Sequence, residues 1–236
     1  MAPQFLKNLH LCYSDTMQTN STVLKSKHGD WLLKTAEDRL KNYLVPKLPK
    51  WLETYHLTYL TAVWSFLIIL SFYFGASDHR YLFLVPIWVA LQYLTDLLDG
   101  AVGRFRDTGL VRWGYYADHF LDFVFTVSII LGYGFLTGFN PWLFVLLAVA
   151  SGSMVHTFLF VSAGNAFNIS YLKIGPTEGR LLFIIAHLLL VGFGLPYLPR
   201  LLPWAAILGL VGLMLSSFFT QKQLWKIDMM EKGGKP

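Results

Sequence analysis

The feature that most constrains this chain is a series of six apolar stretches, each about as long as a membrane is thick. The hydrocarbon core of a bilayer, about 30 Å thick, requires roughly 20 predominantly apolar residues per helix. Charged residues make up only 14% of the 236 residues, whereas a typical soluble domain contains about 25%. We therefore predict an all-α membrane protein with six transmembrane helices, at residues 55–75, 81–103, 115–136, 142–162, 181–198 and 202–220.

A shorter stretch before the first span has a different pattern. Between residues 30 and 44 apolar side chains recur at helical spacing among charged ones, Asp30 is a suitable N-cap, and Pro46 stops the helix. We predict an amphipathic helix in the membrane interface with its apolar side toward lipid; the alternative is a helix packed on the protein. The predicted organisation is a polar cytosolic arm, this helix with its linker, a six-span membrane domain and a basic tail, at residues 1–29, 30–54, 55–220 and 221–236.

The lysines and arginines indicate how the spans are oriented. Six crossings would place 17 of the 19 basic residues on one side of the membrane and only Arg80 and Arg200 on the other. Since basic loops stay in the cytosol, we expect both termini, and the loop between the second and third spans, to face the cytosol. The net charge of +5 then reflects topology and attraction to anionic lipids, not nucleic-acid binding.

Acidic residues cluster where the second span ends and the third begins. Asp96 and Asp99 are three residues apart, and Asp118 and Asp122 are four apart, so each pair shares a helix face. A short loop makes the two spans antiparallel neighbours, which would bring four carboxylates together. Carboxylates that close repel one another, and a hard divalent cation such as Mg²⁺ or Mn²⁺ resolves the repulsion. The sequence offers no cysteine or paired-histidine set, which argues against zinc.

Glycines lie on the same helix faces as these acids, and arginines flank them. Glycines let a bulky ligand approach the backbone, while arginines pair with phosphates. Together they predict a site for a nucleotide pyrophosphate, with the candidates Gly100, Gly103, Gly114, Arg104 and Arg112. Helix packing is the alternative role for Gly100 and Gly103. His156 and His187, each alone within a span, are better explained as buried, hydrogen-bonded residues than as catalytic ones.

These residues resemble the signature of the CDP-alcohol phosphotransferase family, D-x2-D-G-x2-A-R-x8-G-x3-D-x3-D. Two departures are present: Gly103 stands in place of the alanine, and nine residues instead of eight separate Arg104 from Gly114. We expect the extra residue to lie in the loop. Weaker similarities occur at residues 55–58 and 175–179, the second resembling a segment of choline and ethanolamine phosphotransferases. The matching signature positions are Asp96, Asp99, Gly100, Arg104, Gly114, Asp118 and Asp122.

The resemblance implies a reaction in which a CDP-linked donor gives its phospho-alcohol group to the hydroxyl of an acceptor alcohol, and CMP leaves. It implies two Mg²⁺ or Mn²⁺ ions bound by Asp96, Asp99 and Asp118, with Asp122 as a general base that can also touch a metal. It further implies a homodimer. These residues would combine metal catalysis with proton transfer.

The resemblance leaves the substrates open, except that one of them is a lipid. We expect CDP-diacylglycerol or a similar lipid donor with a small polar acceptor. The alternative is CDP-choline or CDP-ethanolamine with diacylglycerol as acceptor. Substrate-binding candidates are Arg112 and, in the connection between the fourth and fifth spans, Lys173, Glu178 and Arg180.

Two other functions fit part of the pattern. A cation transporter also carries acids within its spans, but such acids lie near the bilayer midplane, often on broken helices. Here the acids lie toward the cytosolic end of the spans and beside arginines. The second rival is an inactive scaffold that keeps the metal site. The sequence favours the transferase over both.

Overall fold

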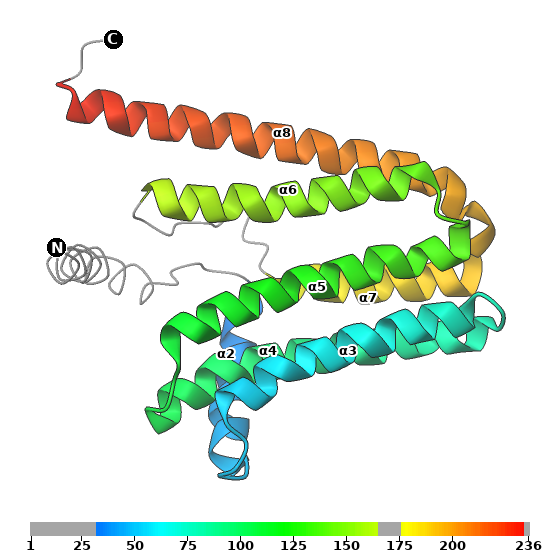
Figure 1. Ribbon diagram of the computed structural model, residues 1–236, viewed down its shortest axis with the longest axis horizontal. Helices are drawn as coiled ribbons and strands as arrows, with labels where there is room; N and C mark the ends of the chain where they lie inside the picture. The colour runs from blue at the N-terminus through cyan, green and yellow to red at the C-terminus, as the bar shows by residue number, and fades with distance from the viewer. Residues whose placement is uncertain (1–31, 165–175, 234–236) are drawn as a thin grey trace, which may run out of the picture.

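The computed structural model describes residues 32–164 and 176–233, and every regular element within these ranges is helical (Figure 1). The predicted polar arm, the Asp30 cap and the candidate Lys173 lie outside the described residues. The elements are α2 (Lys34–Leu44), η1 (Val45–Lys47), α3 (Thr54–Gly75), η2 (His79–Leu84), α4 (Val85–Arg106), α5 (Val111–Thr137), α6 (Pro141–Gly164), α7 (Pro176–Leu189), η3 (Leu190–Gly194), η4 (Leu195–Tyr197) and α8 (Leu198–Glu231).

Five stretches of the described chain are long and apolar enough to cross a membrane. The first four correspond to α3, η2 with α4, α5 and α6, and the fifth runs from Thr177 to Glu231 across α7 and α8. The all-helical fold is confirmed, with five candidate membrane spans among the described residues, and the count of six spans stays a prediction. The physical reason is the length of α7: its 14 residues extend about 21 Å, short of the roughly 30 Å core. Figure 1 shows the chain reversing direction between α7 and α8.

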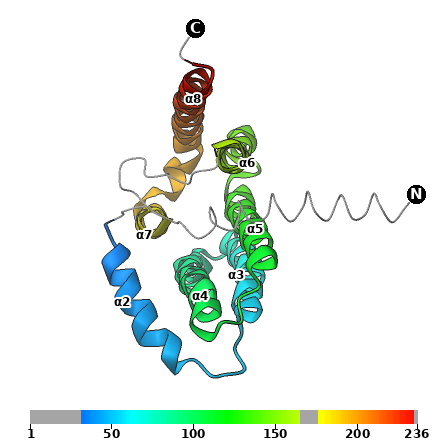
Figure 2. The same cartoon turned by 90° about the vertical axis from the view of Figure 1, so that its left-hand side faces the viewer.

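The helix α3 organises the half of the molecule that carries the acids. It packs against both α4 and α5, which approach each other much less closely than either approaches α3. The helix α7 packs against α4, and α6 packs against α5 and α8. Figures 1 and 2 show α6 and α8 together on one side, with α7 next to α4. The two acid-bearing helices run antiparallel, as predicted (Figure 1), but each packs mainly on α3 and not on the other.

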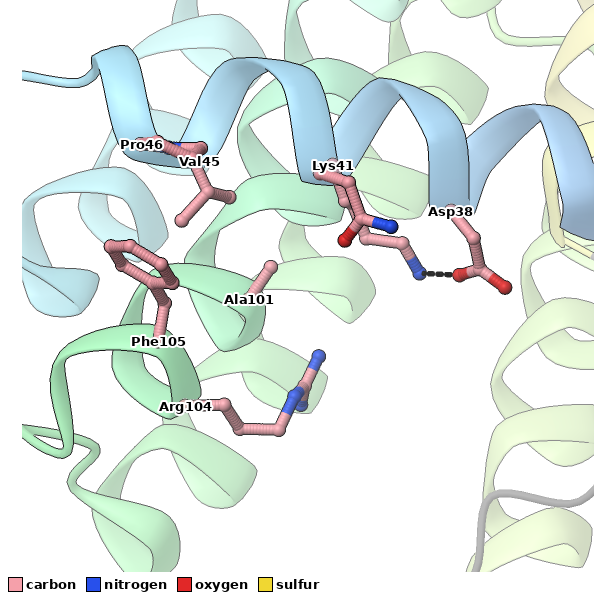
Figure 3. A pocket seen from close by; sticks show the side chains of 8 residues that line it. Asp38, Lys41, Val45, Pro46, Ala101, Arg104 and Phe105 are labelled. Carbon is pink, nitrogen blue, oxygen red and sulfur yellow. Dashed lines mark ion pairs between the residues drawn. The ribbon is translucent and has the colours of Figure 1, made fainter.

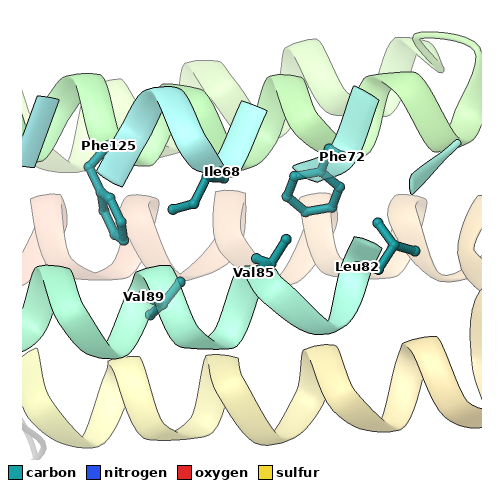
Figure 4. Packing of buried hydrophobic residues seen from close by; sticks show 6 residues of the cluster. All are labelled: Ile68, Phe72, Leu82, Val85, Val89 and Phe125. Atoms are coloured by element: carbon teal, nitrogen blue, oxygen red, sulfur yellow. The ribbon is translucent and has the colours of Figure 1, made fainter. Parts of the chain in front are cut away.

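One buried apolar cluster fixes these helices on the side of the acids away from the α4–α5 loop (Figure 4). Because lipid is as apolar as these side chains, close van der Waals packing is what holds the helices together. Gly132 makes room for Phe72, whose ring lies where any side chain at position 132 would be. The packing leaves the stretch of α4 beyond Gln92 and the stretch of α5 before Asp122 outside this core. The cluster consists of Ile68, Phe72, Leu82, Val85, Val89 and Phe125.

The basic residues of the described chain gather at one end of the bundle, which we call the basic end. Figure 1 shows that α2, the end of α4, the start of α5 and the end of α8 all lie there. Arg80 in η2 and Arg200 at the start of α8 belong to elements at the opposite end. This charge distribution is the one that the sequence predicted; that the basic end faces the cytosol stays a prediction.

The helix α2 crosses the direction of the long helices at the basic end (Figures 1 and 2). It ends at Leu44 and is followed by Pro46 in η1, as predicted. Its apolar side chains Leu40 and Tyr43 are exposed, whereas its acidic residue Glu37 is only 5% exposed. The helix thus contacts the protein through Glu37 and, at its end, through Leu44, and it leaves other apolar side chains available to lipid. Its interfacial location stays a prediction.

The end of α4 anchors the linker that joins η1 to α3. Arg106 is the last residue of α4, and its guanidinium also lies 3.9 Å from the carboxylate of Glu53. Backbone carbonyls need hydrogen-bond donors, and this single side chain satisfies four of them in one turn. The accepting oxygens, at 2.7–3.3 Å, belong to Leu48, Pro49, Lys50 and Leu52.

Candidate active site

Three of the four predicted aspartates meet between α4 and α5. Asp96 on α4 and Asp118 and Asp122 on α5 each offer a carboxylate oxygen, and these oxygens all lie within 4.8 Å of one another. All three side chains are partly buried. The helical spacing explains the encounter, since Asp118 and Asp122 are one turn apart on the face of α5 turned toward α4. The sequence prediction of converging carboxylates thus holds for these three residues.

The fourth predicted aspartate, Asp99, is turned toward α3. Its carboxylate accepts a hydrogen bond from the hydroxyl of Thr58 at 3.1 Å and another from the backbone N–H of Gly100. Asp99 is 9% exposed, and it lies close enough to Asp118 to interact with it electrostatically. A residue three positions after Asp96 is rotated about 60° around the helix, which is enough to face α3. Its role as a metal ligand stays a prediction.

Arg180 joins the three acids from α7. Its Nη2 atom lies 2.9 Å from Oδ2 of Asp96 and 3.6 Å from Oδ1 of Asp122, so one guanidinium bridges α4 and α5. Only 17% of the Arg180 side chain is exposed. Arg180 is a substrate-binding candidate from the sequence, and in the structure it contacts two of the predicted metal ligands directly. A partly buried cation there offsets part of the repulsion among the carboxylates.

Gln92 forms the inner boundary of the acid cluster. It is fully buried, and its side-chain N–H donates to Oδ1 of Asp122 at 3.4 Å. Gln92 is not among the residues predicted from the sequence. The available signal was a polar residue inside an apolar span, four positions before Asp96 and therefore on the same helix face.

The predicted glycines differ in their surroundings. At Gly100 an added side chain would meet only the end of the Arg104 side chain, at 3.2 Å, and at Gly114 it would meet nothing within 4 Å. At Gly103 it would meet Thr54 Oγ1 at 2.8 Å and the backbone of Gly109 at 3.0 Å. Gly100 and Gly114 thus leave space that a ligand can use, whereas Gly103 permits close packing of the loop. Nucleotide contacts of all three stay predictions.

The loop between the two halves of the motif contains four residues. The helix α4 continues to Arg106 and α5 begins at Val111, so the acids of both halves lie on unbroken helix. Asp107 ends α4 in the left-handed conformation, with φ of 56° and ψ of 33°. We expect this loop to hold the extra residue between Arg104 and Gly114, since an insertion in the loop leaves the helical register on either side unchanged.

Arg104 lines a hollow of about 280 Å³ between α2 and the end of α4 (Figure 3). Lys41 of α2 is on the opposite wall, where it forms an ion pair with Asp38 at 2.6 Å. The hollow therefore has a basic side chain on each of the two helices. Arg104 is itself exposed, which leaves it accessible to a phosphate.

The remaining predicted residues are dispersed. Arg112 is exposed on the first turn of α5. Glu178 accepts a hydrogen bond from the backbone N–H of Leu33 at 2.9 Å and thereby caps the start of α2. His187 is buried between the Tyr133 hydroxyl, at 2.7 Å, and a backbone carbonyl, as a structural histidine would be.

The acid cluster has the chemistry of a site for hard divalent ions. Magnesium binds oxygen ligands at about 2.0–2.1 Å and is commonly held by one or two carboxylates together with substrate phosphates. Oxygens that already lie within 4.8 Å of one another need only small side-chain rotations to share such an ion. Asp96, Asp118 and Asp122 would hold it.

Comparison with known proteins agrees with the site. The family model of CDP-alcohol phosphatidyltransferase matches residues 51–218, which is more than half of the chain and includes the whole acidic motif. No curated protein matches the sequence. The resemblance carried by the motif is thus confirmed over α3 to α8, and the chain belongs to the CDP-alcohol phosphatidyltransferase family.

Proposed function

We propose that this protein transfers a substituted phosphate group from a CDP-alcohol, either CDP-diacylglycerol or a similar lipid donor, to a small polar acceptor alcohol, with release of CMP. The observation that carries the proposal is the meeting of Asp96, Asp118 and Asp122 within 4.8 Å in a chain of this family. Members of this family use divalent metal ions, and membership supports a transfer of a phosphate group from a CDP-alcohol to an acceptor. The choice of a lipid donor over a lipid acceptor is part of the proposal.

In the proposed reaction the acceptor oxygen attacks the phosphorus that carries the alcohol group. A new P–O bond forms to the acceptor, the bond to the bridging oxygen of the pyrophosphate breaks, and its electron pair leaves with CMP. The acceptor proton passes to the carboxylate of Asp122. Bound divalent ions, two in our proposal, would neutralise the negative charge of the phosphates.

The surrounding residues bind and orient the donor in this proposal. Gly100 and Gly114 leave room for the nucleotide beside the helix backbones. Arg104 is exposed at the basic end, and Arg180 is held at the acids; both can pair with phosphate oxygens. The site lies toward the end of the membrane-spanning helices, where a water-soluble substrate and a lipid can both reach it. We place this end, and both termini, on the cytosolic side.

The test is CMP release by the purified protein in lipid nanodiscs, measured for a panel of CDP-linked donors against a panel of alcohols. The proposal expects release with a lipid CDP donor and a polar alcohol in Mg²⁺ or Mn²⁺, and none in excess chelator until metal is restored. Release only with CDP-choline or CDP-ethanolamine and diacylglycerol would assign the chain to the other branch. Release that persists in excess chelator would contradict the metal site.

A further inference from the structure

A buried charge on α2 has no role in the reaction proposed above. Glu37 is 5% exposed although it lies on an amphipathic helix where Thr35, Ala36, Arg39 and Leu40 are exposed. Burying a carboxylate is unfavourable unless hydrogen bonds compensate for the lost water. Its partner is Thr177 of α7, 6% exposed, whose hydroxyl donates to the Glu37 carboxylate. This contact joins residues 140 positions apart in the sequence.

Tyr93 of α4 links this pair to the acid cluster. Its hydroxyl interacts with both Glu37 and Thr177. The face of its ring lies 5.8 Å from the Arg180 guanidinium carbon, within the range of a cation–π contact. The end of the same guanidinium contacts Asp96 and Asp122. A continuous set of contacts therefore runs from α2 to the carboxylates.

The position of Arg180 along α7 completes the connection. Thr177 and Arg180 are three residues apart, so they lie on neighbouring turns of one helix face. The start of α7 is also attached to α2 through the hydrogen bond from Leu33 to Glu178. We infer that Glu37, Thr177 and Tyr93 form a bridge that positions Arg180 at the acid cluster, and so make the amphipathic helix α2 part of the active site's supporting structure.

Two readouts separate this bridge from a merely structural contact. The first is a double-mutant cycle on kcat/KM for CMP release, which rests on the proposed function. Glu37→Ala should lower kcat/KM about tenfold, as coupled neighbours do, and should have no further effect in an Arg180→Gln background. Glu37→Gln keeps an oxygen that accepts from Thr177, so it should retain near-wild-type activity. Arg39→Gln, which removes an exposed charge from the same helix, is the matched control and should change nothing.

The second readout is Mn²⁺ affinity, titrated by electron paramagnetic resonance, and it does not require activity. Arg180→Gln should tighten Mn²⁺ binding severalfold because a cation beside the ligands is removed. Glu37→Ala and Thr177→Val should shift affinity in the same direction by releasing Arg180. Loss of the Glu37 charge alone would weaken binding, so the sign of the shift distinguishes the two explanations. Thr177→Val removes no charge and provides the test if Glu37→Ala does not fold.

Additive losses in the cycle, or weaker Mn²⁺ binding in Glu37→Ala together with an unchanged affinity in Thr177→Val, would overturn the bridge. If the wild-type protein releases no CMP with any donor, the proposed function is contradicted. The shifts in Mn²⁺ affinity would still decide whether the bridge positions Arg180.

Discussion

Asp122→Asn tests the proposed chemistry most directly, because the substitution removes the proposed proton acceptor and one negative charge while keeping the size and shape of the side chain. The amide has nearly the same size as the carboxylate. The amide oxygen can still accept hydrogen bonds from Gln92 and Arg180, whose nitrogen atoms lie 3.4 Å and 3.6 Å from Oδ1 of Asp122 in the wild-type protein. The site should therefore keep its geometry, and the loss of one negative charge beside Asp96 and Asp118 reduces their mutual repulsion. We expect no decrease in the melting temperature.

The expected loss follows from the role of the residue. A positioned general base contributes about 10²–10⁴-fold to a rate, or about 3–5 kcal/mol of transition-state stabilisation. Asp122 also belongs to the group of oxygens within 4.8 Å, so the substitution should weaken metal binding as well. The two effects are separated by measuring turnover at saturating Mn²⁺, where the loss of metal affinity no longer limits the rate.

The assay is single-turnover CMP release from protein preloaded with the donor, alongside equilibrium binding of the same donor. We expect release to slow by at least 10²-fold while donor affinity stays within a few-fold of wild type. Asp228→Asn, at an exposed acid near the end of α8, is the control and should have wild-type rates. Wild-type turnover by Asp122→Asn, or full recovery at high Mn²⁺, would remove Asp122 as the base.

Three further substitutions test the surroundings of the acids. Gly100→Leu should leave the melting temperature nearly unchanged, since the added side chain meets only the flexible end of Arg104, but should abolish measurable donor binding; undiminished donor affinity would show that Gly100 serves helix packing alone. Gly103→Leu should instead lower stability, by about 1–3 kcal/mol or more, because it overpacks against backbone, and an unaltered melting temperature would contradict the close approach. Thr58→Val deprives the buried Asp99 of a hydrogen bond, which costs about 1–3 kcal/mol; a melting curve matching wild type would show that this bond contributes nothing.

Local sequence patterns determined the helical fold and the content of the site. Apolar runs of membrane length predicted helices that the structure contains, because hydropathy and length are properties of a single segment. The four-residue spacing predicted that Asp118 and Asp122 share a face, because the period of the α-helix is independent of tertiary context. The meeting of Asp96 with Asp118 and Asp122 followed from a short loop joining two such faces.

Tertiary structure decided what those patterns left open. Whether Asp99 joins the other acids depends on α3, which supplies Thr58 and packs against both α4 and α5. Arg180 and Asp96 are 84 positions apart in the sequence, and they meet only because α7 packs against α4. The sequence pattern around Glu37 is typical of a solvated charge on an amphipathic helix, yet Glu37 is buried and contacts Thr177 of α7. Such contacts depend on how helices are placed relative to one another, and no local periodicity encodes that placement.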